Sequence, residues 1–164
     1  MVGDDTAQSF RSLCLAAHHG QKELVGDQLR QLVATGDFPD FARLPRVAHG
    51  YSRNLVSEQF GASIWAIVWS PGAATPIHDH HCSCGFAVVR GALREARFCV
   101  APCGRVSTSE SVIRTAGFVA SMVPSTPNIH QMVNDSPEEA ISLHVYGYSP
   151  SRHASSVARE YDPV

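Results

Sequence analysis

The segment IHDHHCSCGF, residues 77–86, carries three histidines and two cysteines within a few positions. Imidazole nitrogens and thiolate sulfurs are the side-chain donors that bind zinc, iron and related metals in proteins. His78 and His80 are two residues apart, so in an extended strand their side chains point to the same side. His81 points to the other side and is not expected to join them. The segment therefore predicts a metal site that includes His78 and His80.

A further imidazole is expected from a later strand. The segment PSTPNIHQMVN, residues 124–134, places His130 and Asn134 after a proline-rich turn. Together with Gly72 before the His-x-His pair and Gly91 after it, this arrangement resembles the two sequence motifs of the cupin superfamily. The resemblance implies three metal ligands: His78, His80 and His130. Three other histidines lie outside these segments and are expected at the surface: His18, His19 and His49.

The strand after the histidine pair lacks one residue type. Most metal-binding cupins have a glutamate there, whereas this chain has Ser83, Cys84 and Gly85. Three neutral imidazoles leave a divalent ion with its full charge and with open coordination positions. Such a site favours an incoming anion, particularly a thiolate. The same donors could also hold zinc with an activated water, as in a hydrolase or hydratase, so the ligands alone do not separate iron from zinc.

The sequence around these residues predicts a mainly β fold. From about residue 51, apolar runs of five to eight residues alternate with turn sequences rich in Gly, Pro, Asn and Asp. This pattern indicates some ten strands in a cupin-type β-barrel, also called a double-stranded β-helix. Ahead of it, apolar residues at helical spacing predict two short amino-terminal helices that end at Gly20 and Gly36 and pack on the barrel.

The length of 164 residues suits a single cupin domain. Its expected parts are helices in 1–36, a connector in 37–49, the barrel in 51–150, and in 151–164 a tail that covers a barrel edge or stays loose. A net charge of −2 without charged blocks predicts no nucleic-acid partner, and no apolar run reaches the ~20 residues of a membrane span. No export signal is visible, so we expect a cytoplasmic protein with reduced thiols, as a monomer or small homo-oligomer.

Four segments occur in an order that resembles the cysteine dioxygenase (thiol dioxygenase) family of iron cupins. They are YSRNLV at 51–56, HDH at 78–80, NIHQMVN at 128–134 and SLHVY at 142–146. The resemblance covers about residues 51–150, some three-fifths of the chain. It implies one Fe(II) per chain and an enzyme that adds both atoms of O2 to the thiol of L-cysteine, giving cysteine sulfinate.

The resemblance also implies roles for residues around the metal. Arg53 matches the arginine that binds the substrate carboxylate, and Tyr51 matches a tyrosine near that arginine. Ser142, His144 and Tyr146 match a hydrogen-bonded row beside the iron, in which His144 orients Tyr146 toward reacting oxygen. The spacing of these three residues, at i, i+2 and i+4, independently places them on one face of a strand.

The choice of substrate depends on the carboxylate-gripping position. Members of the family that prefer cysteine have an arginine at the position that binds the carboxylate, and members that prefer 3-mercaptopropionate have a glutamine. Arg53 therefore favours L-cysteine. The segment YGYSP, residues 146–150, mixes features of both groups, and Arg152 is a candidate second cation. The alternatives are a dioxygenase for 3-mercaptopropionate or a related small thiol, and a non-enzymatic metal-binding sensor cupin. By composition alone, Arg53 could instead form a surface ion pair.

Some members of the family join a cysteine on the strand after His-x-His to the active-site tyrosine by a thioether. Counting forward from His78 places Gly85 at that position, whereas counting back from Gly91 places Cys84 there. Because strands keep their register and loops absorb deletions, we predict that Cys84 faces Tyr146 and can be cross-linked to it. A zinc site of four thiolates fits the spacings poorly; its candidate members are Cys82, Cys84, Cys99 and Cys103.

Overall fold

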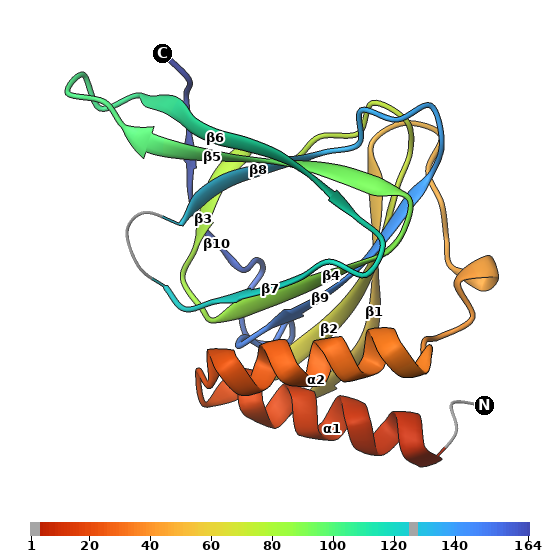
Figure 1. The fold of residues 1–164 in the computed structure, drawn as a ribbon. Coiled ribbons are helices and arrows are strands. Elements are labelled where there is room, and N and C mark those ends of the chain that lie inside the picture. The colour runs from red at the N-terminus through yellow and green to blue at the C-terminus, as the bar shows by residue number, and fades with distance from the viewer. Residues whose placement is uncertain (1–3, 125–127) are drawn as a thin grey trace.

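In a computed structural model that describes residues 4–124 and 128–164, two sheets face each other and two helices pack against the outer side of one of them (Figure 1). The elements are, in chain order, α1 (Asp4–His18), α2 (Lys22–Thr35), the 3-10 helix η1 (Phe41–Arg43), β1 (Tyr51–Gln59), β2 (Ala62–Trp69), β3 (Ile77–His80), β4 (Cys84–Arg90), β5 (Ala92–Val100), β6 (Val106–Thr115), β7 (Val119–Met122), β8 (Ile129–Val133), β9 (Ala140–Tyr146) and β10 (Val157–Tyr161). The proline-rich turn expected before His130 falls partly on residues 125–127, outside the described residues.

The ten strands of the described residues form two five-stranded antiparallel sheets. The order is β1-β2-β9-β4-β7 in the first, here called the helix-side sheet, and β10-β3-β8-β5-β6 in the second, here called the histidine-side sheet. The sheets face each other (Figure 1), and no backbone ladder among the described residues joins them into a continuous barrel. The predicted fold class, a mainly β cupin with short amino-terminal helices, is confirmed.

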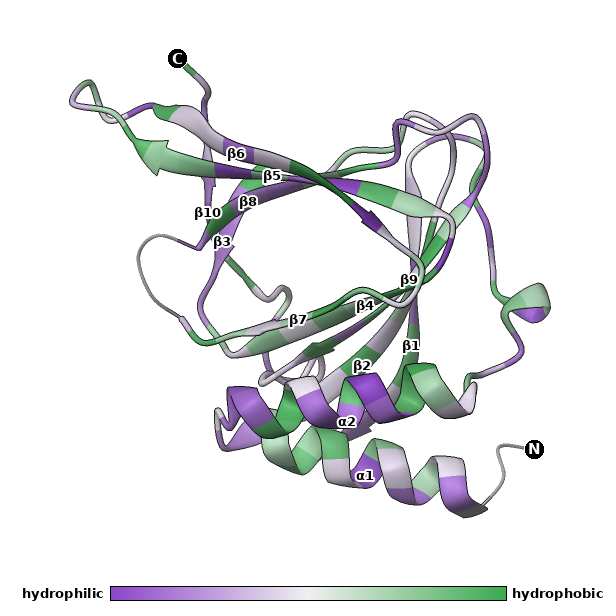
Figure 2. Ribbon diagram, in the orientation of Figure 1, coloured by the Kyte–Doolittle hydropathy of each residue, from purple (hydrophilic) through white to green (hydrophobic). Residues whose placement is uncertain are grey.

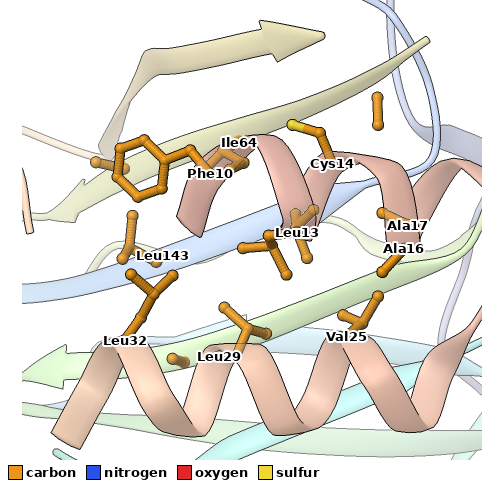
Figure 3. Close-up of a cluster of buried hydrophobic side chains, with 14 residues drawn as sticks. Phe10, Leu13, Cys14, Ala16, Ala17, Val25, Leu29, Leu32, Ile64 and Leu143 are labelled. Atoms are coloured by element: carbon orange, nitrogen blue, oxygen red, sulfur yellow. The ribbon is translucent and has the colours of Figure 1, made fainter. Parts of the chain in front are cut away.

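The two helices cover the outer face of the helix-side sheet. Each helix carries both hydrophobic and hydrophilic residues (Figure 2), as expected for a helix with one buried face. α2 ends where predicted, because Gly36 adopts a left-handed conformation with φ 71° and donates its N–H to the Leu32 carbonyl. The interface is closely packed (Figure 3), and these members are at most 3% exposed: Phe10, Leu13, Cys14, Val25, Leu29, Leu32, Ile64 and Leu143.

Side-chain alternation along β9 determines which residues reach the space between the sheets. Leu143 and Val145 belong to the cluster packed beneath the helices. Because successive side chains on a strand point to opposite faces, Ser142, His144 and Tyr146 point toward the histidine-side sheet. The apolar helix contacts thus fix the orientation of the polar row.

The segment after β9 returns to the histidine-side sheet. β10 lies within the expected tail of residues 151–164 and pairs with β3, where Val157 is opposite His80 and Glu160 is opposite His78. The sheet therefore extends beyond the barrel range of 51–150 expected from the sequence. β10 is largely exposed, so its residues lack the alternating apolar pattern that identifies a half-buried strand.

Candidate metal centre

Three histidines from two neighbouring strands come together between the sheets. His78 and His80 lie on β3, and His130 lies on β8 directly opposite His78. One ring nitrogen from each histidine lies within 4.8 Å of the others, and the Nε2 atoms of His80 and His130 are 3.2 Å apart. All three side chains are buried. The structure thus brings together the three residues expected as metal ligands.

Backbone oxygens orient two of these imidazoles. Nδ1 of His78 is 2.9 Å from the Pro76 carbonyl, and Nδ1 of His80 is 3.3 Å from the Ser156 carbonyl. A carbonyl oxygen can only accept a hydrogen bond, so each Nδ1 carries the hydrogen and each Nε2 keeps its lone pair. Ser156 precedes β10, and no sequence pattern in the tail predicts this role.

His130 has a carboxylate beside its Nδ1 instead of a carbonyl. Oε1 of Glu95, a residue of β5 that is 1% exposed, lies 3.6 Å from this nitrogen. Arg97 and Arg114 donate to the same carboxylate at 3.1 and 2.9 Å. Burial raises the pKa of Glu95, but the contacts with His130, Arg97 and Arg114 outweigh it and lower the pKa to about 2. Sequence reasoning missed Glu95, although a carboxylate between two arginines in an apolar strand was visible in LREARF.

The electrostatics of the three histidines suit a metal ion. Burial, followed by the neighbouring histidines, lowers the pKa of His78 to about 4 and that of His80 to about 2. Both are therefore neutral near pH 7, which is the form that donates to a metal. Nε2 of His80 and Nε2 of His130 lie only 3.2 Å apart, so the two imidazoles direct ring nitrogens toward one point. The donor set therefore fits a divalent transition-metal ion.

The polar row on β9 is hydrogen-bonded as predicted. Oγ of Ser142 is 2.9 Å from Nε2 of His144, and the Tyr146 hydroxyl is 3.1 Å from Nδ1 of His144. Trp69 Nε1 donates to Oγ of Ser142 at 2.8 Å. Because an indole N–H can only donate, the chain of bonds favours one direction, from Trp69 through Ser142 and His144 to the oxygen of Tyr146. In that direction the hydroxyl hydrogen of Tyr146 remains free for a bound ligand.

His144 and Tyr146 of this row line the same cavity as the histidine cluster, whereas Ser142 is not among its lining residues. The ring centroids of His80 and Tyr146 are 5.4 Å apart, across the space between the sheets. The cavity has a volume of about 180 Å³, below the usual ~300–1,000 Å³ of drug-sized sites, and so suits a smaller molecule. Its lining includes these expected site residues: Tyr51, Arg53, His78, His130, His144 and Tyr146.

Arg53 reaches the rim of this cavity from β1 and is exposed to solvent. Its guanidinium lies over the Trp65 ring, 4.6 Å from the centroid, and Nη2 donates to the Tyr148 hydroxyl at 3.3 Å. No ion pair engages Arg53 within the described parts of the chain, whereas Arg152 lines a different groove. Trp65 and Tyr148 were missed, although Tyr148 continues the two-residue spacing of the β9 row.

The register of β4 determines which of the two residues, Cys84 or Gly85, shares a face with Tyr146. Cys84 lies directly opposite Tyr146 in the ladder between β4 and β9. Opposite residues of antiparallel strands share a face, with Cβ atoms roughly 4.5–5.5 Å apart. Gly85 faces α2, because a Cβ atom there would lie only 2.8 Å from Cγ1 of Val25. Cys84 is therefore the residue that shares the interior face with Tyr146.

Among the described residues, the other histidines and the cysteines form no second group of possible metal ligands. His18, His19 and His49 are exposed, as predicted. Cys99 and Cys103 are also exposed, near the turn between β5 and β6, whereas Cys82 and Cys84 are buried.

His81 points away from the cluster and holds the segment before β10. Its Nε2 is 2.8 Å from the Ser155 carbonyl, and its backbone N–H donates to the Ser156 carbonyl at 3.2 Å. The Ser156 carbonyl also lies beside Nδ1 of His80. His81 thus anchors the segment that orients a candidate ligand.

We expect His81→Ala to loosen β10 without removing a metal ligand. A net hydrogen bond contributes about 0.5–1.5 kcal/mol, so amide exchange in residues 157–161 should rise roughly 2- to 12-fold. Hydrogen–deuterium exchange with mass spectrometry measures this change, and His49→Ala provides an exposed-histidine control. Unchanged exchange in His81→Ala would show that the side chain does not retain the segment.

The fold and the three-histidine site define the class of protein as a cupin with a candidate metal centre. The family model described as cysteine dioxygenase type I matches residues 27–159. The chain belongs to the cysteine dioxygenase type I family.

Solved structures show the same fold. An uncharacterised conserved protein with a double-stranded β-helix domain from Klebsiella pneumoniae is 19% identical, with a TM-score of 0.53 over 66% of this chain and 81% of the other. TT1209 from Thermus thermophilus is also 19% identical, with a TM-score of 0.53 over 66% and 94%. Oxalate oxidase in complex with glycolate is 15% identical, with a TM-score of 0.52 over 68% of this chain and 58% of its own. At these identities the likeness establishes the fold alone.

No helix among the described residues is long and apolar enough to cross a membrane.

Proposed function

We propose that this protein is an Fe(II)-dependent thiol dioxygenase that oxidises L-cysteine to cysteine sulfinate. The observation that carries the proposal is the shared cavity, which is lined by the three converging imidazoles, by Tyr146 and by Arg53. Membership of the family supports the reaction class. Three residues would hold the iron: His78, His80 and His130. Fe(II) bound there would supply the redox chemistry by which O2 adds to a thiolate.

Charged groups on the cavity lining support an amino-acid substrate. Arg53 and Glu160 are the Arg, Lys, Asp and Glu residues among the described lining residues, and burial keeps His78, His80 and His144 neutral near pH 7. Arg53 would pair with the substrate carboxylate. The contacts of its guanidinium with Trp65 and Tyr148 restrict it in advance, which reduces the entropy lost on binding. Glu160 supplies a negative charge that favours a substrate with an amino group over 3-mercaptopropionate.

Tyr146 would act on the oxygen side of the reaction. Burial raises the pKa of Tyr146, so its hydroxyl stays protonated and can donate a hydrogen bond. His144, whose pKa burial lowers to about 3, stays neutral and holds that hydroxyl in place. The overall reaction balances without a further reductant: thiolate and O2 give sulfinate, two S–O bonds form, the O–O bond breaks, and sulfur loses four electrons.

A thiol panel with iron-loaded protein tests this proposal against the two alternatives. Oxygen consumption should show the highest kcat/KM with L-cysteine, lower values with 3-mercaptopropionate, and the lowest with cysteamine, which lacks the carboxylate. A preference for 3-mercaptopropionate would assign the protein to the second substrate class. Full iron content without oxygen consumption on any of these thiols would favour the sensor.

We also propose that Cys84 becomes linked to Tyr146 by a thioether during turnover. The link forms a bond from Sγ to the phenol ring and removes two hydrogens, and O2 accepts the two electrons and two protons. Intact-mass and peptide mapping after incubation with iron, L-cysteine and O2 should find the two peptides joined with that mass loss. Cys82→Ala, which removes a neighbouring buried thiol, should leave the link intact. Free Cys84 after many turnovers would contradict the proposal.

A further inference from the structure

A buried carboxylate, paired with two partly exposed arginines, lies beside His130, one of the three candidate ligands. Glu95, Arg97 and His130 lie on the paired strands β5 and β8, where Arg97 is directly opposite His130. Glu95 is two residues from Arg97 and therefore shares its face of the sheet. Arg114 joins from β6, where it lies opposite Leu93, the next residue along that face of β5. Three strands thus converge on one carboxylate.

The hydrogen bonds of this carboxylate leave a lone pair of Oε1 free, and an unpartnered ring nitrogen of His130 lies beside it. Oε1 of Glu95 accepts from Arg97, and Oε2 accepts from Arg114. A carboxylate oxygen has two lone pairs, so Oε1 can accept a second hydrogen bond. Nδ1 of His130 is 3.6 Å from Oε1 and has no hydrogen-bond partner in the described part of the protein. Closing this gap needs a shift of only a few tenths of an ångström.

We propose that Glu95 is a positioning residue for the metal centre, which acts through Nδ1 of His130 to aim Nε2 at the metal. As acceptor it keeps the hydrogen of His130 on Nδ1, which leaves the Nε2 lone pair for the ion. Arg97 and Arg114 hold the carboxylate behind the imidazole, so that it supports the ligand and does not become one. This inference rests on the proposed metal site and requires neither a thiol nor O2.

The competing explanation is that Glu95 has a structural role only and connects β5 to β6 through its ion pairs with Arg97 and Arg114. The two explanations differ in metal affinity. A tie between strands changes the melting temperature, whereas an acceptor behind a metal-bound histidine changes the affinity of folded protein for the ion, typically by 10- to 100-fold. The chain offers a matched control in Glu110, an exposed carboxylate 3.9 Å from Nε of the same Arg97.

The test measures Co(II) binding to metal-free protein by competition with a chelator, together with the melting temperature. Glu95→Gln should bind Co(II) roughly 10- to 100-fold more weakly than wild type. Glu110→Gln should bind within twofold of wild type. A folded Glu95→Gln protein with wild-type affinity would overturn the proposal.

A second measurement needs no variant and remains valid if Glu95→Gln does not fold. Nitrogen-15 NMR of the metal-free wild type reports which ring nitrogen of His130 carries the hydrogen. The proposal expects the hydrogen on Nδ1, and a hydrogen on Nε2 would overturn it. If the wild type binds Co(II) but oxidises no thiol, the proposed function fails while the inference about Glu95 stands.

Discussion

Replacing His130 with alanine should remove most of the iron from the purified protein and abolish thiol oxidation. The wild type should contain about one iron per chain, and the variant keeps only two of the three converging imidazoles. Loss of a ligand should weaken binding by more than the ~100-fold upper range for loss of an outer partner. Elemental analysis after equilibration with Fe(II) measures the iron, and an oxygen electrode measures the activity.

The matched control for this experiment is His19→Ala, which removes an exposed histidine that does not line the cavity of the three histidines. It should keep the iron content and activity of the wild type. Wild-type iron content in His130→Ala would contradict the assignment of the three histidines as the iron ligands.

Arg53→Ala should selectively impair turnover of substrates that carry a carboxylate. A hydrogen bond to a charged group contributes about 1.5–3 kcal/mol, so kcat/KM for L-cysteine should fall roughly 10- to 150-fold. The exposure of Arg53 places the effect toward the lower end, because solvent screens a charge pair at the cavity rim. Cysteamine, which has no carboxylate, should be a poor substrate for the wild type and change little in the variant.

Arg152→Ala is the control for this second prediction. Arg152 is also exposed, but it lines the groove beside His18 and His81 and not the cavity of the three histidines. Its removal should leave kcat/KM for both thiols unchanged. Equal losses on L-cysteine and cysteamine in Arg53→Ala would show that Arg53 has a structural role and does not bind the carboxylate.

Short-range spacing explains why much of the site was predictable from the sequence. Two-residue periodicity put His78 with His80, and Ser142 with His144 and Tyr146, because alternate residues of any strand share a face. The motif around His130 supplied the third imidazole. For Cys84, trust in the register of a strand over the length of a loop selected the correct face.

The site residues that the sequence did not predict depend on contacts between strands that are far apart in the chain. Glu95 meets His130 only through the pairing of β5 with β8, and the Ser156 carbonyl meets His80 only because β10 returns to β3. No local pattern encodes such a pairing, and the exposed residues of β10 resemble a loop. The support for Arg53 likewise comes from Tyr148, on the chain just beyond β9.

The most direct test of the central claim is the fate of labelled oxygen. Iron-loaded protein is incubated with L-cysteine under ¹⁸O2 in unlabelled water, and the product is analysed by mass spectrometry. We expect cysteine sulfinate that carries two ¹⁸O atoms, with one O2 consumed per sulfinate formed. A product with one ¹⁸O atom or none, or oxygen consumption that yields only disulfide and peroxide, would contradict it.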